Sequence, residues 1–198
     1  MPAVLGIRLT RAGAGCEIMR KYGMDLLPVR LRPFAEPDLE LFDRFATDPA
    51  FSEPFEWVGF TPPGGYRRRW EQDGLLGSAP YCLAVVTVDD DALAGWVDWR
   101  ETERPGRGAW EIGVLIAPQM RGRGAGAAAQ RLLVEYLFST TTAFRIWAAT
   151  EVENIAEQRA LERIGFSQEG RLRGTHFRDG QWRDTFIYGI VRDDIGGS

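Results

Sequence analysis

The sequence is poor in cysteine, histidine and lysine, and these shortages exclude several classes of protein. Two cysteines in 198 residues are too few for the disulfide framework of a small secreted domain. A single histidine, His176, excludes a zinc site built from clustered Cys and His side chains. We therefore expect no bound metal, and we expect a reducing compartment, the cytoplasm.

Long apolar runs and an excess of positive charge are also lacking. No run of about 18 or more apolar residues is present, so no transmembrane helix or membrane association is predicted. The N-terminus shows no compact apolar core or cleavage pattern of a signal peptide. With a formal net charge of −4, the chain is not expected to bind nucleic acid, which requires clustered positive charge. A cationic small molecule or a peptide amine is the expected partner.

What the sequence does contain suits one globular domain. The chain has 198 residues, of which 44% are hydrophobic and 12% aromatic, enough to bury one sizeable core. Residues 1–23 show no sustained hydrophobic period, and we interpret them as a poorly ordered N-terminal extension. Residues 24–198 are interpreted as a single domain that begins with the patterned strand Leu27–Leu31. Whether residues 1–23 belong to the native chain is left open.

The hydrophobic pattern changes character half-way along the chain. The first half predicts a strand near 27–33, a helix from 36, a proline-punctuated loop at 47–63, a short helix near 65–74, and strands at 81–88, 93–99 and 110–116. The second half predicts a glycine loop at 121–126, a helix to Phe138, a strand at 144–150, a helix at 154–164, strands from Phe166 and over 182–191, and a frayed tail at 196–198. This order predicts a mixed α/β sheet.

The most informative segment runs from Trp110 to Gly126, where an apolar strand leads through Pro118 into a glycine-rich turn and a helix. Glycines at 122, 124 and 126 let successive backbone N–H groups converge, and the helix adds its positive dipole end. The segment therefore predicts a pyrophosphate-binding turn. A tight connection whose glycines serve only packing is the alternative. The spacing fits no dinucleotide-binding fingerprint, and no P-loop lysine is present.

Two motifs carry a resemblance to a known family. Arg121-x-x-Gly124-x-Gly126 resembles the Arg/Gln-x-x-Gly-x-Gly/Ala signature of the Gcn5-related N-acetyltransferases (GNAT). The segment Asn154–Phe166 is similar to the family's second motif, a helix that starts at Asn and closes in Gly-Phe. The pattern most resembles the branch with the ribosomal-protein N-terminal acetyltransferases and covers approximately residues 27–192. It implies a GNAT-like fold, with a mostly antiparallel N-terminal half and a splayed parallel strand pair around the cofactor site.

The resemblance also implies acetyl-CoA as cosubstrate, held largely by backbone groups. Leu115 and Ile116 would pair with the pantetheine arm in the manner of an added strand. The pyrophosphate would be held by backbone N–H groups of Arg121, Gly122, Arg123, Gly124, Ala125 and Gly126. Asn154 would contact the CoA arm, and it is also expected to cap its helix, with Glu157 three residues later.

For the chemistry, the resemblance points to Glu111 as the general base. An alkyl ammonium is almost entirely protonated at neutral pH, so a base should help to produce the neutral amine. The alternative is a Glu111 that faces solvent. A backbone N–H near Leu115 would stabilise the oxyanion. Many relatives carry a tyrosine as general acid where this chain has Leu161. Tyr188 and His176 are candidate substitutes, although packing or surface roles are favoured for both.

The expected function is transfer of an acetyl group from acetyl-CoA to a primary amine, by direct attack on the thioester. The alternative is a sensor or structural module of the same fold that binds acyl-CoA without turnover. Aromatics of the 47–63 loop, above all Phe55 and Trp57, are candidates to contact the acceptor, with Glu53 and Glu56 attracting its ammonium. These aromatics could instead only pin the loop to the core. The acceptor's identity and a homodimer formed through Trp182 and Phe186 are left open.

Overall fold

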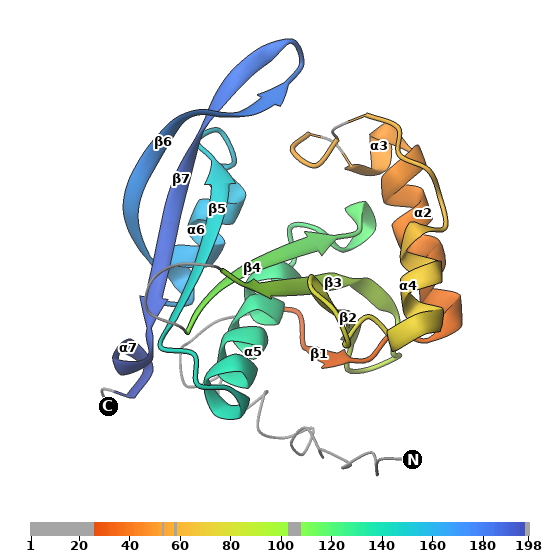
Figure 1. Ribbon diagram of the computed structural model, residues 1–198, viewed down its shortest axis with the longest axis horizontal. Helices are drawn as coiled ribbons and strands as arrows, with labels where there is room; N and C mark the ends of the chain where they lie inside the picture. The colour runs from red at the N-terminus through yellow and green to blue at the C-terminus, as the bar shows by residue number, and fades with distance from the viewer. Residues whose placement is uncertain (1–25, 53, 58, 103–107, 197–198) are drawn as a thin grey trace.

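A seven-stranded mixed sheet, in the strand order β1-β2-β3-β4-β5-β7-β6, organises the protein (Figure 1). The structure, a computed structural model, describes residues 26–52, 54–57, 59–102 and 108–196. The predicted N-terminal extension, residues 1–23, lies outside the described residues. The mixed α/β architecture predicted from the sequence is confirmed.

The strands are β1 (Val29–Arg32), β2 (Tyr81–Thr87), β3 (Leu93–Glu101), β4 (Ala109–Ile116), β5 (Arg145–Glu151), β6 (Ser167–Arg178) and β7 (Gln181–Val191). The α-helices are α2 (Glu40–Thr47), α3 (Pro49–Ser52), α4 (Gly65–Asp73), α5 (Ala125–Thr140), α6 (Ile155–Arg163) and α7 (Arg192–Gly196). Two 3₁₀ turns, η1 (Glu36–Leu39) and η2 (Pro118–Met120), precede α2 and α5.

Two short helices depart from the sequence prediction. Helix α3 forms inside the expected 47–63 loop, where the ring of Phe51 is buried and the Ser52 hydroxyl donates to the carbonyl oxygen of Phe45 at 2.7 Å. Helix α7 includes Gly196, which was expected to begin a frayed tail. The carboxylate of Asp194 accepts a hydrogen bond from the backbone N–H of Val191 at 2.9 Å, and this bond caps the start of the helix. Both helices depend on contacts that hydrophobic periodicity does not report.

The central strand β4 has different neighbours along its two edges. It pairs with β3 in antiparallel register from Gly95↔Ile116 to Glu101↔Trp110. With β5 it pairs in parallel only from Ala109↔Arg145 to Glu111↔Trp147. Beyond Glu111 the described parts of these two strands diverge. The splayed parallel pair predicted from the sequence is thus present.

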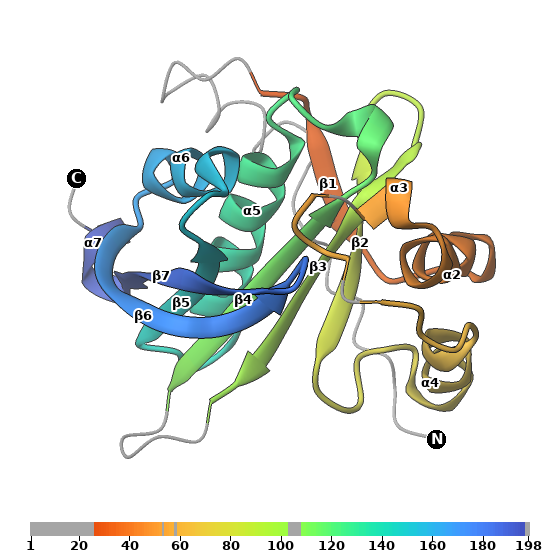
Figure 2. The ribbon, with the colours of Figure 1, turned by 90° about the horizontal axis from the view of Figure 1, so that it is seen from above.

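The helices cover the sheet on both faces, and the two cores differ in composition (Figure 2). Helices α5 and α6 pack on one face over a mainly aliphatic core that includes Val97, Leu133 and Ile146. Helices α2 and α4 lie over the other face of β2 and β3, where Phe42 and Trp96 are buried. Residues of β3 alternate between the two cores, as expected for a strand covered on both sides.

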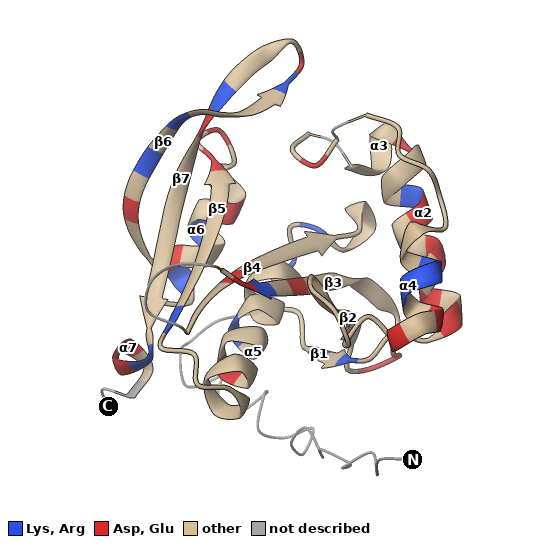
Figure 3. Ribbon diagram, viewed as in Figure 1, with Lys and Arg blue, Asp and Glu red and all other residues tan. Residues whose placement is uncertain are grey.

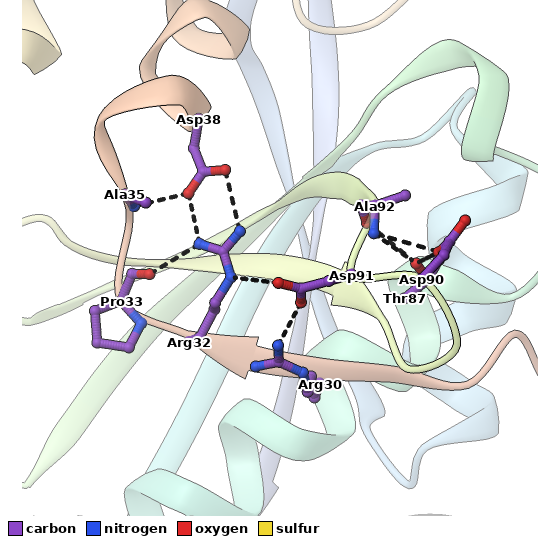
Figure 4. A network of polar contacts seen from close by, with 9 residues as sticks. All are labelled: Arg30, Arg32, Pro33, Ala35, Asp38, Thr87, Asp90, Asp91 and Ala92. Atoms are coloured by element: carbon purple, nitrogen blue, oxygen red, sulfur yellow. Dashed lines mark hydrogen bonds and ion pairs between the residues drawn. The ribbon is translucent and has the colours of Figure 1, made fainter.

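A polar network fixes the corner where β1 leads into α2 (Figure 4). The guanidinium of Arg32 binds the carboxylate of Asp38 at 2.5 and 3.1 Å, and the same carboxylate accepts from the backbone N–H of Ala35 at 2.7 Å. Arg30 pairs with Asp91 in the turn between β2 and β3. These bonds hold the first helices in place over β3, next to the position where β4 and β5 diverge.

Candidate active site

The glycine turn connects β4 to the N-terminus of α5. Gly122 and Gly124 both lie in the left-handed region, at φ of 72° and 79°. A Cβ atom at Gly124 would lie 2.4 Å from Leu26 Cδ2 and 3.3 Å from its Cα, so this glycine is also required for packing. A Cβ at Gly126 would make only an ordinary 3.6 Å contact with Ile116. Packing thus explains Gly124, but it leaves Gly126 without a steric reason.

The turn fits an anionic group such as a pyrophosphate. The first N–H groups of an α-helix have no partner within the helix, and the dipole of the 16-residue α5 favours negative charge at this end. The backbone carbonyl of Arg123 accepts from the N–H of Leu27 at 2.9 Å, which holds the turn against the segment before β1. The residues present therefore suit the phosphates of CoA.

The arginine side chains of the turn make contacts within the protein. Nε of Arg121 donates to the carbonyl oxygen of Ile116 at 2.8 Å, and a terminal nitrogen donates to that of Phe51 at 2.8 Å. Burial lowers the pKa of Arg121. A terminal nitrogen of Arg123 lies 3.7 Å from the sulfur of Met120. Arg121 thus ties the end of β4 to α3, and the backbone stays the first candidate for the phosphates.

Helix α6 begins and ends as the sequence predicts. The Asn154 side chain accepts from the backbone N–H of Glu157 at 3.2 Å, so Asn154 caps the helix. At the other end, Gly165 has a φ of 101°, and the N–H of Phe166 bonds to the carbonyl of Leu161 at 3.0 Å. Asn154 also lines the cavity between β5 and the β6–β7 hairpin, where it is available to a ligand.

A cavity of about 960 Å³ opens on the face of β4, β5 and β7 opposite α5. Its wall includes the predicted residues Glu111, Asn154 and Phe55, and also Trp147 and Glu151. The side chain of Glu111 is 20% exposed and forms an ion pair with Arg100 at 2.7 Å. Glu111 therefore faces this cavity as a paired carboxylate.

A smaller cavity of about 350 Å³ lies on the same face, between β3, β4 and the helices α2 and α4. Aromatic rings form much of its wall: those of Phe42 and Tyr66 stack with centroids 3.8 Å apart, and that of Trp96 lies 4.7 Å from Phe42. Leu115 lines it, so the cavity reaches the strand position predicted to bind the thioester. Glu56 lines both cavities and marks their junction.

Three carboxylates lie around this junction: Asp98, which the sequence analysis missed, Glu157, which it named only for the helix cap, and Glu56, which it expected to attract the acceptor ammonium. Burial raises the pKa of Asp98 on β3 to about 6 and that of Glu157 on α6 to about 7. The pKa of Glu56 is also raised, mainly by burial and to a smaller extent by the charge of Asp98. Figure 3 shows acidic segments both in the loop after α3 and at the end of β5. The alternation Trp96, Asp98, Arg100 along one face of β3 was the available sequence signal for Asp98.

The predicted aromatic contacts of the 47–63 loop separate into different environments. Phe51 is buried in the core, whereas Phe55 lines the larger cavity with the guanidinium of Arg178 5.2 Å from its ring centroid. The rings of Trp57 and Phe60 pack edge to face at 5.0 Å, and Phe60 is 78% exposed. Of these aromatics, the structure brings only Phe55 to the wall of a described cavity. Glu53 lies outside the described residues.

The two candidates for the general acid are also placed apart. Tyr188 is fully buried, and its hydroxyl pairs with the carboxylate of Glu162 at 3.2 Å on the α6 side of the sheet. Burial and Glu162 raise the pKa of Tyr188. His176 lines the larger cavity, with Nε2 3.7 Å from a carboxylate oxygen of Glu151. The structure thus places His176, but not Tyr188, on the side of the cavity.

Comparison with known families matches residues 29–167 to the model described as an acetyltransferase (GNAT) domain. The chain belongs to the GNAT acetyltransferase family. It is 30% identical over 136 residues to a probable N-acetyltransferase, YjcK, of Bacillus subtilis, which covers 68% of this chain and 75% of the relative. It is 26% identical to the ribosomal protein uS5-alanine N-acetyltransferase of Escherichia coli, over 78% of this chain and 82% of that enzyme.

The fold agrees with this membership. A spermidine N-acetyltransferase from Vibrio cholerae, solved with CoA and spermine, superimposes with a TM-score of 0.70 at 18% identity, over 85% of this chain and 98% of that one. GNAT enzymes use acetyl-CoA, and this chain is an N-acetyltransferase that transfers the acetyl group to an amine. Across the described residues, no cluster of His, Cys, Asp and Glu suited to a metal is found, and no helix is long and apolar enough to cross a membrane.

Proposed function

We propose that this GNAT enzyme acetylates a primary amine, in a small molecule or at a protein N-terminus, that binds in the cavity of about 960 Å³. The observation that carries the proposal is the position of this cavity, on the open face where β4 and β5 diverge. Its wall contains the carboxylate of Glu56 and the arginine-paired carboxylates of Glu111 and Glu151, and this acidic lining suits an ammonium group.

In this proposal the acetyl-CoA site is built mainly from backbone groups. The N–H groups from Gly122 to Gly126 hold the pyrophosphate, whereas the N–H of Arg121, which was also expected to do so, donates to the carbonyl oxygen of Pro118 at 3.2 Å. The edge of β4 at Leu115 and Ile116 faces the pantetheine arm. A backbone N–H near Leu115 stabilises the oxyanion as the amine attacks the thioester carbon. Asn154 contacts the CoA arm while it caps α6. A carboxylate of the open face takes the proton of the ammonium, and Glu111 is the one that the family resemblance assigns.

Two kinds of acceptor are compatible with the site. The Escherichia coli relative is named for an alanine of a ribosomal protein, and the Vibrio cholerae structure holds spermine. Phe55 and the wide cavity admit either a polyamine or an extended N-terminal peptide.

We also propose that the enzyme is located in the cytoplasm and has no nucleic-acid partner. We further propose a homodimer that forms through the hairpin around Trp182, which is 67% exposed. Phe186, the other aromatic expected at this interface, is instead partly buried against the core.

Calorimetric titration with acetyl-CoA tests the cofactor site. In Gly126→Trp the indole would stand at the start of α5 without the clash that a side chain at position 124 would cause. We expect at least a roughly tenfold weaker affinity in this variant, about 1.4 kcal/mol. Ser139→Trp, exposed near the far end of the same helix, is the matched control and should bind like the wild type. Equal affinities in all three proteins would contradict the assigned site.

A panel of acceptors then tests the reaction. Spermidine, a peptide with an N-terminal alanine and an amino sugar are each incubated with acetyl-CoA, and released CoA thiol and acetylated product are measured. Turnover with one of these amines supports the proposal. Tight acetyl-CoA binding without turnover on any of them would favour a sensor that binds acyl-CoA.

A further inference from the structure

We propose that Asp98 is the catalytic carboxylate that holds the acceptor ammonium and takes its proton. This inference rests on the proposed function and assigns the base to β3, on a residue distinct from Glu111. It rests on the register of the β3–β4 ladder, on the space that the glycine at position 113 leaves above β4, and on the groups that surround the Asp98 carboxylate.

The register places Asp98 beside the point where β4 and β5 separate. Glu111 forms the last β4–β5 pair, with Trp147. Gly113 is the next position along β4 that faces the cavity side, because side chains alternate along a strand. Asp98 pairs with Gly113 in the β3–β4 ladder. Asp98 is therefore one step nearer than Glu111 to Leu115 and the opening between the strands.

The glycine at position 113 gives the Asp98 carboxylate room above β4. A Cβ atom at Gly113 would lie 3.0 and 3.1 Å from the two carboxylate oxygens of Asp98 and 3.3 Å from its Cγ. Any larger residue at position 113 would thus crowd these oxygens. The carboxylate lies over the backbone of β4 where that strand has left β5, which is the place where the thioester and the amine would meet.

The neighbours of Asp98 keep it available as a base. Glu111 is held by Arg100 at 2.7 Å, whereas Trp96 and the charge of Arg100 only partly offset the effect of burial on the pKa of Asp98. The charged groups that act on Asp98 are Arg100 and Glu111, and Glu56 faces it from the loop after α3. Burial of this carboxylate raises its pKa to about 6, so it is ionised at neutral pH and yet is a stronger base than an exposed aspartate.

The proton balance of the reaction is then simple. The Asp98 carboxylate accepts one proton from the acceptor ammonium, which leaves a neutral amine and a protonated Asp98. The amine nitrogen forms the C–N bond with the thioester carbon, and the C–S bond breaks as CoA leaves. The nitrogen passes its surplus proton to the sulfur, which gives the CoA thiol, and Asp98 returns its proton to water.

The test compares Asp98→Asn with Glu111→Gln in the acetylation assay, with the amine of the acceptor panel that the wild type turns over fastest. We expect Asp98→Asn to lower kcat/KM about 100-fold or more and to remove the loss of activity below about pH 6, with the KM for acetyl-CoA nearly unchanged. Asp98→Glu should restore part of the rate. Glu101→Gln, an exposed acid on the same strand, should match the wild type.

A second variant tests the geometry without removing the carboxylate. In Gly113→Ala the added methyl group should displace the Asp98 oxygens and lower kcat roughly tenfold, with acetyl-CoA affinity retained. The proposal is overturned if Asp98→Asn keeps the wild-type kcat/KM and the loss of activity below about pH 6, while Glu111→Gln loses both. A wild type that binds acetyl-CoA but acetylates none of the amines would instead overturn the proposed function, and this inference with it.

Discussion

The carboxylate of Glu157, in the first turn of α6, lies where ionisation is unfavourable. Its pKa is raised from 4.5 to about 7, mainly by burial, with a smaller contribution from the charge of Glu56 and against the lowering effect of Gln130. Glu157, Asp98 and Glu56 thus form a group of carboxylates whose pKa values are all raised. Such groups lower the stability of the folded state and are typical of functional sites.

The first prediction concerns the pH dependence that Glu157 causes. Its pKa is higher in the folded protein than in the unfolded chain, so the folded state binds the proton more tightly, and stability falls as pH rises from about 4.5 to about 7. Glu157→Gln should therefore stabilise the protein by up to roughly 3 kcal/mol at pH 8 and by almost nothing at pH 4. Thermal denaturation at both pH values measures this. The same gain at both would show that the carboxylate has no such role, and Glu101→Gln is the matched control.

At the scale of elements, a buried ion pair ties β6 to the end of β5, in addition to the β5–β7 ladder that extends to Glu151↔Thr185. Arg178 on β6 binds both carboxylate oxygens of Glu151 at 3.0 and 2.7 Å, and both side chains are less than a tenth exposed. The same guanidinium lies over the ring of Phe55. The hairpin, the end of β5 and the loop after α3 thus meet over the larger cavity and determine its width.

The second prediction follows from this pair. Arg178→Met leaves the Glu151 carboxylate buried without its main partner, and we expect a loss of about 3 kcal/mol in the free energy of unfolding, measured by urea denaturation. The matched control is Arg183→Met, because Arg183 pairs at 2.8 Å with Glu153, whose side chain is 53% exposed. It should cost less than about 1 kcal/mol. Similar losses in both variants would mean that the Glu151 pair does not fasten the hairpin.

At the scale of the whole molecule, the sheet consists of two parts with a narrow connection. Strands β1 to β4 form one part and β5 to β7 the other, and the residue pairs from Ala109↔Arg145 to Glu111↔Trp147 join them. Helix α5 contacts β1, β3 and β4 as well as α6, so it spans the division. A ligand that lies between the diverging strands and also binds the start of α5 would connect the two parts.

The third prediction is a large stabilisation by acetyl-CoA. At a concentration 100 times Kd, a ligand that binds only the folded state adds about 2.7 kcal/mol. For a protein of this size the increase corresponds to a rise in Tm of roughly 5–10 °C. Hydrogen exchange should slow at the diverging ends of β4 and β5. At the same ligand concentration, Gly126→Trp, with at least a tenfold weaker affinity, should gain no more than about 1.4 kcal/mol. Its rise in Tm and its protection from exchange should be about half those of the wild type or less, and a full rise in Tm would place the ligand elsewhere.

The sequence by itself determined the order of the elements, the glycine turn, the Asn154 cap and the Gly165 terminus of α6. These features depend on hydrophobic period, on the left-handed conformation of glycine and on hydrogen bonds between residues a few positions apart. Helices α3 and α7 were not predicted, because α3 depends on tertiary packing and α7 on one side-chain cap.

Only the tertiary structure decided which carboxylates meet at the site. Asp98 on β3, Glu157 on α6 and Glu56 in the loop after α3 are far apart in the chain, and each taken alone looks like an ordinary acidic residue. The strand register set Asp98 opposite Gly113. Because that register and the burial of a side chain arise from contacts between distant segments, the local pattern around each residue carries too little information to fix them.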